Sequence, residues 1–222
     1  MPLVNNETSF KLASFGEIDG LKALVASGSA DMNAQDGRGF TPFNWAARNG
    51  HLNVVTYLAE DIGVSMETPS FGGMRPLHHA CNKNSEKIVK YLISKGADVN
   101  CSDENGDKPL HYAAARGVLN ILVALLNNGA TQHANGQGIM PLHKGAIFGQ
   151  LAIVKKLIDF EASSINIPDV RGDTPLHHAA KCGFPLIVKF LVDSGADLLA
   201  KNKDNQTPKE AASTPAIANL IP

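Results

Sequence analysis

The residues best suited to chemistry lie in one short stretch, DTPLHHAAKCG, which runs from Asp173 to Gly183. Imidazole nitrogens and a cysteine thiolate can ligate zinc, and a histidine beside a cysteine can activate the thiolate as a nucleophile. His178 and Cys182 stand four residues apart, a spacing that places both on one face of a helix. The pair therefore offers half of a metal site, or a nucleophile with its base.

Two observations weigh against both chemistries. No third group completes a triad at a suitable spacing, and similar stretches elsewhere carry Lys83, Arg116 or Phe148 at the position of Cys182. Adjacent histidines such as His177 and His178 point about 100° apart on a helix, so they do not converge on one ion. We therefore expect no catalytic residue, no metal ion and no cofactor, and we interpret His178 and Cys182 as residues on the surface of a helix.

The stretch from Asp173 is one copy of a repeated motif. The other copies are FTPFNWAARNG from Phe40, MRPLHHACNKN from Met74, DKPLHYAAARG from Asp107, IMPLHKGAIFG from Ile139 and the partial copy QTPKEAAS from Gln206. Their prolines, Pro42, Pro76, Pro109, Pro141, Pro175 and Pro208, are separated by 34, 33, 32, 34 and 33 residues. A spacing this regular indicates a repeat architecture in which each unit packs only on its neighbours.

A second pattern follows each motif. Ile88, Val89, Leu92 and Ile93 have the spacing i, i+1, i+4, i+5, which makes one apolar stripe on a helix. The same spacing recurs from residues 121, 153 and 187, and a glycine such as Gly96 then ends the helix. Each unit is predicted to be a turn, a short helix, a second helix and a loop closed by glycine.

This signature, TPLHxAA followed by an apolar stripe and GADVN, resembles the ankyrin repeat over nearly the whole chain. The resemblance implies an all-α solenoid of stacked helix–turn–helix units, with β-turn fingers projecting from one side. We expect a single domain over residues 1–222, divided into an N-terminal capping unit (5–37), five full repeats (38–71, 72–104, 105–136, 137–170 and 171–203) and a C-terminal capping unit (204–222) with a polar outer helix.

Four motif histidines, His78, His111, His143 and His177, occupy the same position, which Asn44 fills in the second unit. Neighbouring helices pack about 8–10 Å apart, whereas zinc needs its donors about 2 Å from one ion, so these histidines are not expected to form a metal site. The resemblance implies instead that each histidine makes hydrogen bonds that tie the turn to the helix.

Residues that differ between repeats are the candidates for binding. In an ankyrin-like stack the turn tips and the exposed side of the first helix line the concave face, and aromatic residues, Met and Arg are enriched at protein interfaces. We predict partner contacts, with Trp45, Tyr112 and Phe148 as anchors. The candidates are Arg38, Phe40, Trp45, Arg48, Phe71, Met74, His79, Lys83, Glu104, Asp107, Tyr112, Arg116, Ile139, Lys144, Phe148, Arg171, Asp173, His178 and Lys181.

The predicted function is a non-enzymatic scaffold or adaptor that binds a partner protein through this concave face. The organisation is also similar to gankyrin-type chaperones of proteasome regulatory-particle assembly, which is one alternative. An RNA- or nucleotide-binding repeat module is another, with Trp45, Phe71 and Tyr112 as stacking platforms. The formal net charge of −1 argues against nucleic acid and anionic membranes.

Composition also bounds the compartment. Three cysteines are too few for a disulfide framework and fit a reducing environment. No apolar run is long enough to span a bilayer, and the start MPLVNNETSF does not resemble a secretory signal. We expect a monomeric protein in the cytoplasm, with the nucleus also possible, and no association with a membrane.

Overall fold

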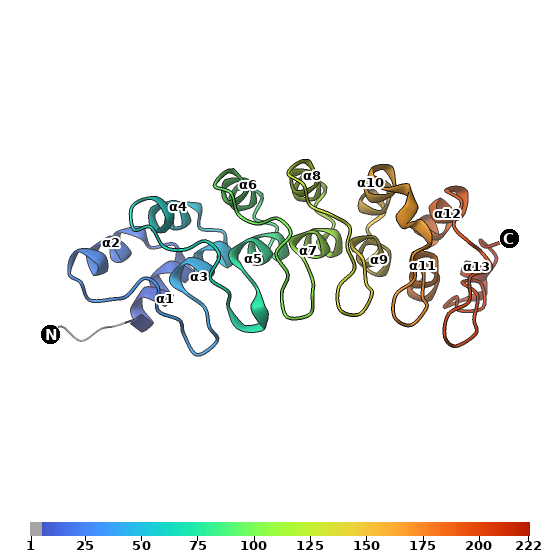
Figure 1. Ribbon diagram of the computed structural model, residues 1–222, viewed down its shortest axis with the longest axis horizontal. Coiled ribbons are helices and arrows are strands. Elements are labelled where there is room, and N and C mark those ends of the chain that lie inside the picture. The colour runs from blue at the N-terminus through green and yellow to red at the C-terminus, as the bar shows by residue number, and fades with distance from the viewer. Residues whose placement is uncertain (1–5) are drawn as a thin grey trace.

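The helices form two parallel rows in the computed structural model, which describes residues 6–222 (Figure 1). Residue 5, where the first unit is expected to begin, lies outside the described residues. The inner row contains α1 (Asn6–Phe15), α3 (Pro42–Asn49), α5 (Pro76–Asn82), α7 (Pro109–Arg116), α9 (Pro141–Ile147) and α11 (Pro175–Cys182). The outer row contains α2 (Ile18–Ala26), α4 (Leu52–Glu60), α6 (Glu86–Ser94), α8 (Leu119–Asn127), α10 (Leu151–Phe160) and α12 (Pro185–Asp193). The expected all-α solenoid is confirmed.

Each inner helix from α3 to α11 begins at the motif proline, where the missing N–H leaves no hydrogen bond unmade. Thr41 and Thr174 precede two of these prolines and accept the backbone N–H of the third helical residue as N-caps. The apolar stripe of each outer helix lies in the core, and Leu92 of α6 is fully buried. Ala46 and Ala47 are also fully buried, because small side chains let α3 lie close to its neighbours α1 and α5.

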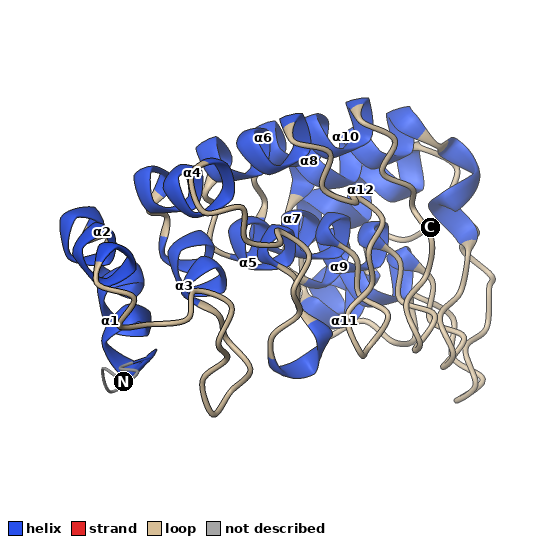
Figure 2. Ribbon diagram, turned by 60° about the vertical axis from the view of Figure 1, so that its left-hand side comes forward, coloured by secondary structure: helices blue, strands red, loops and turns tan. Residues whose placement is uncertain are grey.

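A five-residue segment, here called a finger, precedes each inner helix from α3 to α11 and also the C-terminal motif proline, Pro208, and projects from one side of the helix rows (Figure 2). The first to sixth fingers are residues 36–40, 70–74, 103–107, 135–139, 169–173 and 202–206. In each finger the backbone N–H of the first residue donates to the carbonyl of the fifth. Adjacent fingers are joined by one further backbone bond, such as Val170 N–H to the Gln137 carbonyl at 3.1 Å. Within residues 6–222 these bonds form no regular strand.

Gly138 shows why glycine is needed between fingers. Its φ of +72° lies in the left-handed region, and an added Cβ would stand 2.8 Å from the backbone nitrogen of Val170 in the next finger. Similar backbone approaches occur at Gly73 and Gly106. Close stacking of the fingers therefore depends on the absence of a side chain at these positions.

The C-terminal unit departs from the expected polar outer helix. Residues 208–211 form only turns, and α13 (Pro215–Ala218) is a single short turn of helix. Thr214 has extended backbone angles, as expected for a residue before proline, so it separates the two segments. A second departure is the short 3-10 helix Ala162–Asn166 after α10, where the sequence lacks the usual glycine stop. None of the helices in the described chain is long and apolar enough to cross a bilayer.

Candidate protein-binding groove

The motif histidines connect each inner helix to the following finger. Nδ1 of His78, His111, His143 and His177 accepts the backbone N–H three residues earlier, at 3.0–3.2 Å. Their Nε2–H groups are therefore the donors, and those of His78, His111 and His177 bond to the last carbonyl of the next finger, at 2.9–3.1 Å. His143 differs, because its buried Nε2 lacks a hydrogen bond of standard geometry. The structural role implied for these histidines is confirmed.

Burial keeps these imidazoles neutral. It lowers the pKa of all four motif histidines, and that of His143 to about 4. A neutral ring with Nε2–H can accept at Nδ1 and donate at Nε2 at the same time, which is the arrangement that the hydrogen bonds require.

The residue after the motif histidine, or after its Asn44 replacement, also has a structural partner. Trp45 Nε1 donates to Asp36 Oδ2 at 2.9 Å, and the Tyr112 hydroxyl donates to Asp103 Oδ2 at 2.6 Å. His79 and His178 make the equivalent contacts at 2.7 and 2.9 Å, with Ser70 Oγ and Asp169 Oδ2. In all four pairs the helix residue follows its finger partner by nine positions. These four side chains brace α3, α5, α7 and α11 against their own fingers, whereas Lys144 of α9 bonds to Asp107 of the third finger.

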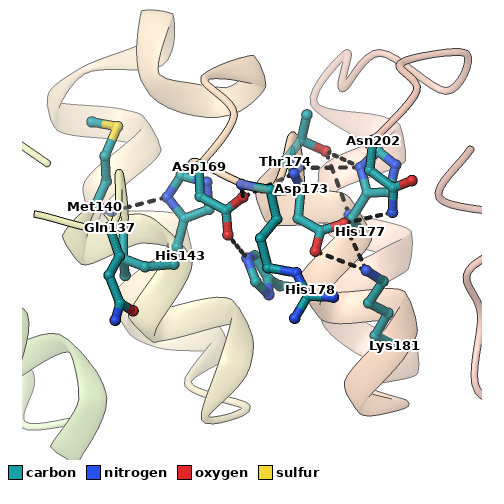
Figure 3. A network of polar contacts seen from close by, with 12 residues as sticks. Gln137, Met140, His143, Asp169, Asp173, Thr174, His177, His178, Lys181 and Asn202 are labelled. Carbon is teal, nitrogen blue, oxygen red and sulfur yellow. Dashed lines mark hydrogen bonds and ion pairs between the residues drawn. The ribbon is translucent and has the colours of Figure 1, made fainter. Parts of the chain in front are cut away.

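The fifth finger carries a buried charged network that the sequence alone did not reveal (Figure 3). Lys181 Nζ lies 2.7 Å from both carboxylate oxygens of Asp173, which also accepts the side-chain amide of Asn202 at 2.8 Å. Burial opposes ionisation of Asp173, but the bonds from Lys181 and Asn202 outweigh it and hold its pKa below the ordinary value. Asp169 Oδ1 accepts the backbone N–H of Arg171 and of Asp173 itself.

Asp169, Asp173 and His178 present ligand atoms within 4.8 Å of one another, a spacing that could surround a cation. The ammonium of Lys181 already supplies the positive charge beside Asp173, and both carboxylates accept from protein donors. The donor set therefore fits a structural ion-pair network better than a metal site.

The nineteen predicted contact residues divide into three groups by exposure. Those that are buried are Phe40, His79, Asp107, Ile139 and Asp173. Those that are half-buried are Trp45, Arg48, Met74, Tyr112, Lys144, His178 and Lys181. Those that are exposed are Arg38, Phe71, Lys83, Glu104, Arg116, Phe148 and Arg171. The buried group lies too deep for its side chains to make extensive contacts with a partner, which narrows the candidate surface to the other two groups.

Two adjoining hollows open between the fingers and the inner helices, and together they are called the groove. The first, about 450 Å³, is lined by Gly37, Arg38, Phe40, Arg48, Phe71, Met74, His79, Asn82 and Lys83. The second, about 200 Å³, is lined by Asn82, Asp107, His111, Tyr112, Ala115, Arg116, Lys144 and Phe148. Asn82 lines both, and its Oδ1 accepts Arg116 Nε–H at 2.8 Å. The groove brings together predicted contact residues of four inner helices, α3, α5, α7 and α9, and of the first three fingers.

A third hollow of about 390 Å³ lies between α1 and α3, with Phe10, Phe15 and Trp45 in its lining. Phe15 is 71% exposed. Sequence reasoning missed the two phenylalanines, because α1 lacks the proline–histidine motif that gives the register of the other inner helices.

Comparison with known proteins shows to which family this fold belongs. The profile of a family described as ankyrin repeats in three copies matches residues 9–103, 61–136, 95–167 and 110–202. The chain belongs to the ankyrin repeat family. The crystal structure of the human ASB11 ankyrin repeat domain superposes with a TM-score of 0.86 at 26% identity, covering 96% of this chain and 95% of that one.

Two curated relatives match through a small part of their own length. Alpha-latrocrustotoxin-Lt1a of Latrodectus tredecimguttatus is 34% identical over 197 residues, which are 81% of this chain and 14% of the toxin. Palmitoyltransferase AKR1 of Lachancea kluyveri is 27% identical over 199 residues, which are 86% of this chain and 27% of that protein. Ankyrin repeat domains generally mediate protein–protein interaction, and this chain shares their architecture.

His178 and Cys182, which have the spacing of a base and its nucleophile, do not show an activated thiol. Burial raises the pKa of Cys182, which disfavours the thiolate, and the nearby Lys181 charge only partly opposes this effect. His178 points its Nε2 at Asp169. The arrangement braces the fifth finger and leaves Cys182 as an ordinary exposed thiol.

Proposed function

We propose that this ankyrin repeat chain is a non-enzymatic interaction module that binds a partner protein in the groove. The observation that carries the proposal is the exposure of two large aromatic side chains there. Phe71 is 81% exposed and Phe148 is 53% exposed, and each lines one of the two adjoining hollows. Exposed aromatic side chains beside a hollow are typical anchors of protein interfaces.

Neither exposed phenylalanine has an evident role in the stack. Both lie outside the buried core, whereas Trp45 and Tyr112 are half-buried, pack against it and bond to their own fingers. We therefore shift the expected anchors from Trp45, Tyr112 and Phe148 to Phe71 and Phe148, with Trp45 and Tyr112 as supports of the surface.

The similarity to known proteins supports an interaction module, but it does not support the activity of any one relative. The two relatives carry the names of a toxin and of a palmitoyltransferase, and the matched residues are a minor part of each. Their whole-protein activities are not carried over to this chain, because sites and not folds determine function. A gankyrin-like role stays an expectation from organisation alone, since no contact in the groove favours that partner over others.

The proposal can be tested by selecting binders to the whole chain from a displayed library of natural protein fragments. Each selected fragment is then titrated against the Phe71→Ala/Phe148→Ala double variant. A matched control, Phe160→Ala/Lys87→Glu, removes an apolar side chain and a positive charge from exposed positions on the outer row. We expect fragments that lose about tenfold or more in affinity with the groove variant and little with the control. Selected fragments that respond only to the control would contradict the proposal.

A further inference from the structure

We propose that the hollow between the first and second fingers binds an acidic segment of a partner protein that inserts one large apolar side chain. This inference rests on the proposed function and adds the chemical nature of the partner. It assigns the apolar contact to Phe71 and Met74, with the buried Phe40 ring at the base of the hollow, and the recognition of negative charge to Arg38, Arg48 and Lys83.

The lining of the hollow is apolar at its base. Phe40 is only 5% exposed and His79 only 4% exposed, and their rings lie 4.8 Å apart between centroids. Burial, with a smaller contribution from the Arg48 charge, lowers the pKa of His79 to about 3, so its ring stays neutral at physiological pH. Phe71 stands exposed at the edge. A volume of about 450 Å³ lies within the range of ligand sites, so the hollow has room for a large side chain.

Positive charge surrounds this apolar base. Arg38, Arg48 and Lys83 all line the hollow, and no acidic residue does. Within the described chain none of the three forms an ion pair with a carboxylate. Arg48 lies over the aromatic pair, 5.4 Å from the Phe40 ring centroid and 5.5 Å from that of Trp45, and these contacts leave its charge uncompensated.

Further along the groove, in the second hollow, one of the two basic side chains is already paired with a carboxylate. Lys144 Nζ lies 3.0 Å from the buried carboxylate of Asp107, and Arg116, the other cation there, donates its Nε–H to Asn82 Oδ1 at 2.8 Å. The first hollow has three cations and no carboxylate, whereas the second has two cations and one carboxylate. The excess of positive charge is therefore greatest in the N-terminal part of the groove, in a chain whose formal net charge is −1. Charge complementarity favours carboxylates on the partner at this place.

A protein segment fits these features better than a nucleic acid. Binding to nucleic acid is dominated by neutralisation of many phosphates along an extended basic surface. Here three unpaired cations enclose one apolar hollow, and Phe71 is the one exposed ring among its lining residues, whereas successive bases of a single strand stack on several aromatic side chains. The geometry matches one apolar side chain flanked by carboxylates.

The test uses defined probes on the whole chain. Three synthetic peptides, GEEFEEG, GEEAEEG and GKKFKKG, and an oligouridylate are titrated to millimolar concentration by nitrogen–proton correlation spectroscopy. Trp45 is the single tryptophan and its ring lies 4.7 Å from that of Phe40, so its indole N–H resonance reports on the hollow. We expect GEEFEEG to shift this resonance saturably, more weakly as salt rises, and the other three probes to bind at least about tenfold more weakly.

Variants separate the two contributions. Phe71→Ala should weaken GEEFEEG binding without changing the melting temperature, because that side chain is outside the core. Arg38→Glu/Lys83→Glu should reverse the preference between GEEFEEG and GKKFKKG, whereas Lys87→Glu, an exposed charge on the outer row, should not. Equal binding of acidic and basic peptides, no saturable shift, or displacement by oligouridylate would overturn the inference. Library fragments whose binding is weakened by Phe148→Ala but not by Arg38→Glu/Lys83→Glu would overturn this inference and would still support the proposed function.

Discussion

The hydroxyl of Tyr112 lies 2.6 Å from Oδ2 of Asp103, which stands nine positions earlier at the base of the third finger. The carboxylate is buried, and its other oxygen accepts the backbone N–H groups of Asn105 and Asp107 within the finger. Tyr112 thus completes the hydrogen bonding of a buried charge. Tyr112, which was predicted to bind a partner because this position varies between repeats, therefore has a structural role.

Tyr112→Phe tests this role directly. The change keeps the ring and removes one donor to a buried carboxylate, so the free energy of unfolding should fall by about 2 kcal/mol. Urea denaturation measures the loss. The control is Tyr57→Phe. The Tyr57 hydroxyl makes no hydrogen bond within residues 6–222, so its removal should change the free energy of unfolding by less than about 0.5 kcal/mol. Equal effects of the two changes would show that the contact with Asp103 contributes nothing.

Trp45→Ala and Phe148→Ala should differ in their effects on stability. Trp45 packs on the core and bonds to Asp36, so its truncation should cost about 3 kcal/mol. Phe148 is 53% exposed, and its truncation should leave the free energy of unfolding within about 0.5 kcal/mol of wild type. Thermal and urea denaturation of both variants provide the comparison. If the Trp45→Ala protein were as stable as wild type, Trp45 would not support the fold and would again be a candidate anchor for the partner.

Gly138→Ala should weaken the contact between the fourth and fifth fingers. The new Cβ would meet the Val170 backbone, and the φ of +72° is itself unfavourable for alanine. Gly96→Ala has a similar positive φ of +85° with open space around the Cβ, so it isolates the backbone cost of about 1–2 kcal/mol. We expect the loss in Gly138→Ala to exceed that in Gly96→Ala. Similar losses of stability in the two variants would show that the contact of the new Cβ with the Val170 backbone does not destabilise the stack.

The buried histidines predict a loss of stability in mild acid. His143 has a pKa of about 4 in the folded chain against 6.5 as its ordinary value, because burial and the His178 charge disfavour its cation, although Asp169 favours it. As pH falls the unfolded chain takes up the proton first. This histidine's contribution is complete above about pH 6.5 and is lost between there and about pH 4, a loss of about 2 kcal/mol by pH 5.

His143→Asn should remove this part of the pH dependence. In the second unit Asn44 Oδ1 accepts the backbone N–H of Thr41, as His143 Nδ1 accepts that of Met140, so asparagine is compatible with the position. The measurement is urea denaturation at pH 7.5 and pH 5, with exposed His133→Asn as the control. An unchanged difference between the two pH values in His143→Asn would contradict the assignment of the effect to His143.

Much of the architecture could be predicted from local patterns. The motif prolines mark the first turns of the inner helices, the apolar stripes predict the outer helices, and repetition in register indicates a stack in which every unit buries its neighbour's apolar face. The C-terminal unit was less predictable, since its motif is incomplete and Pro215 interrupts the segment that was expected to be a helix.

The surface that is left free for binding, by contrast, depends on which side chains of the inner helices contact a finger in the folded chain. Phe71 and Trp45 look equivalent as aromatic residues in a variable position, yet only Trp45 finds a carboxylate in a finger that folds back beside its helix. Lys83 directly follows α5 and Lys181 lies in the last turn of α11, yet only Lys181 meets a buried aspartate. Side-chain type predicts the capacity for an interaction, whereas the approach of the finger to the helix decides which side chains are already paired and which remain free to bind.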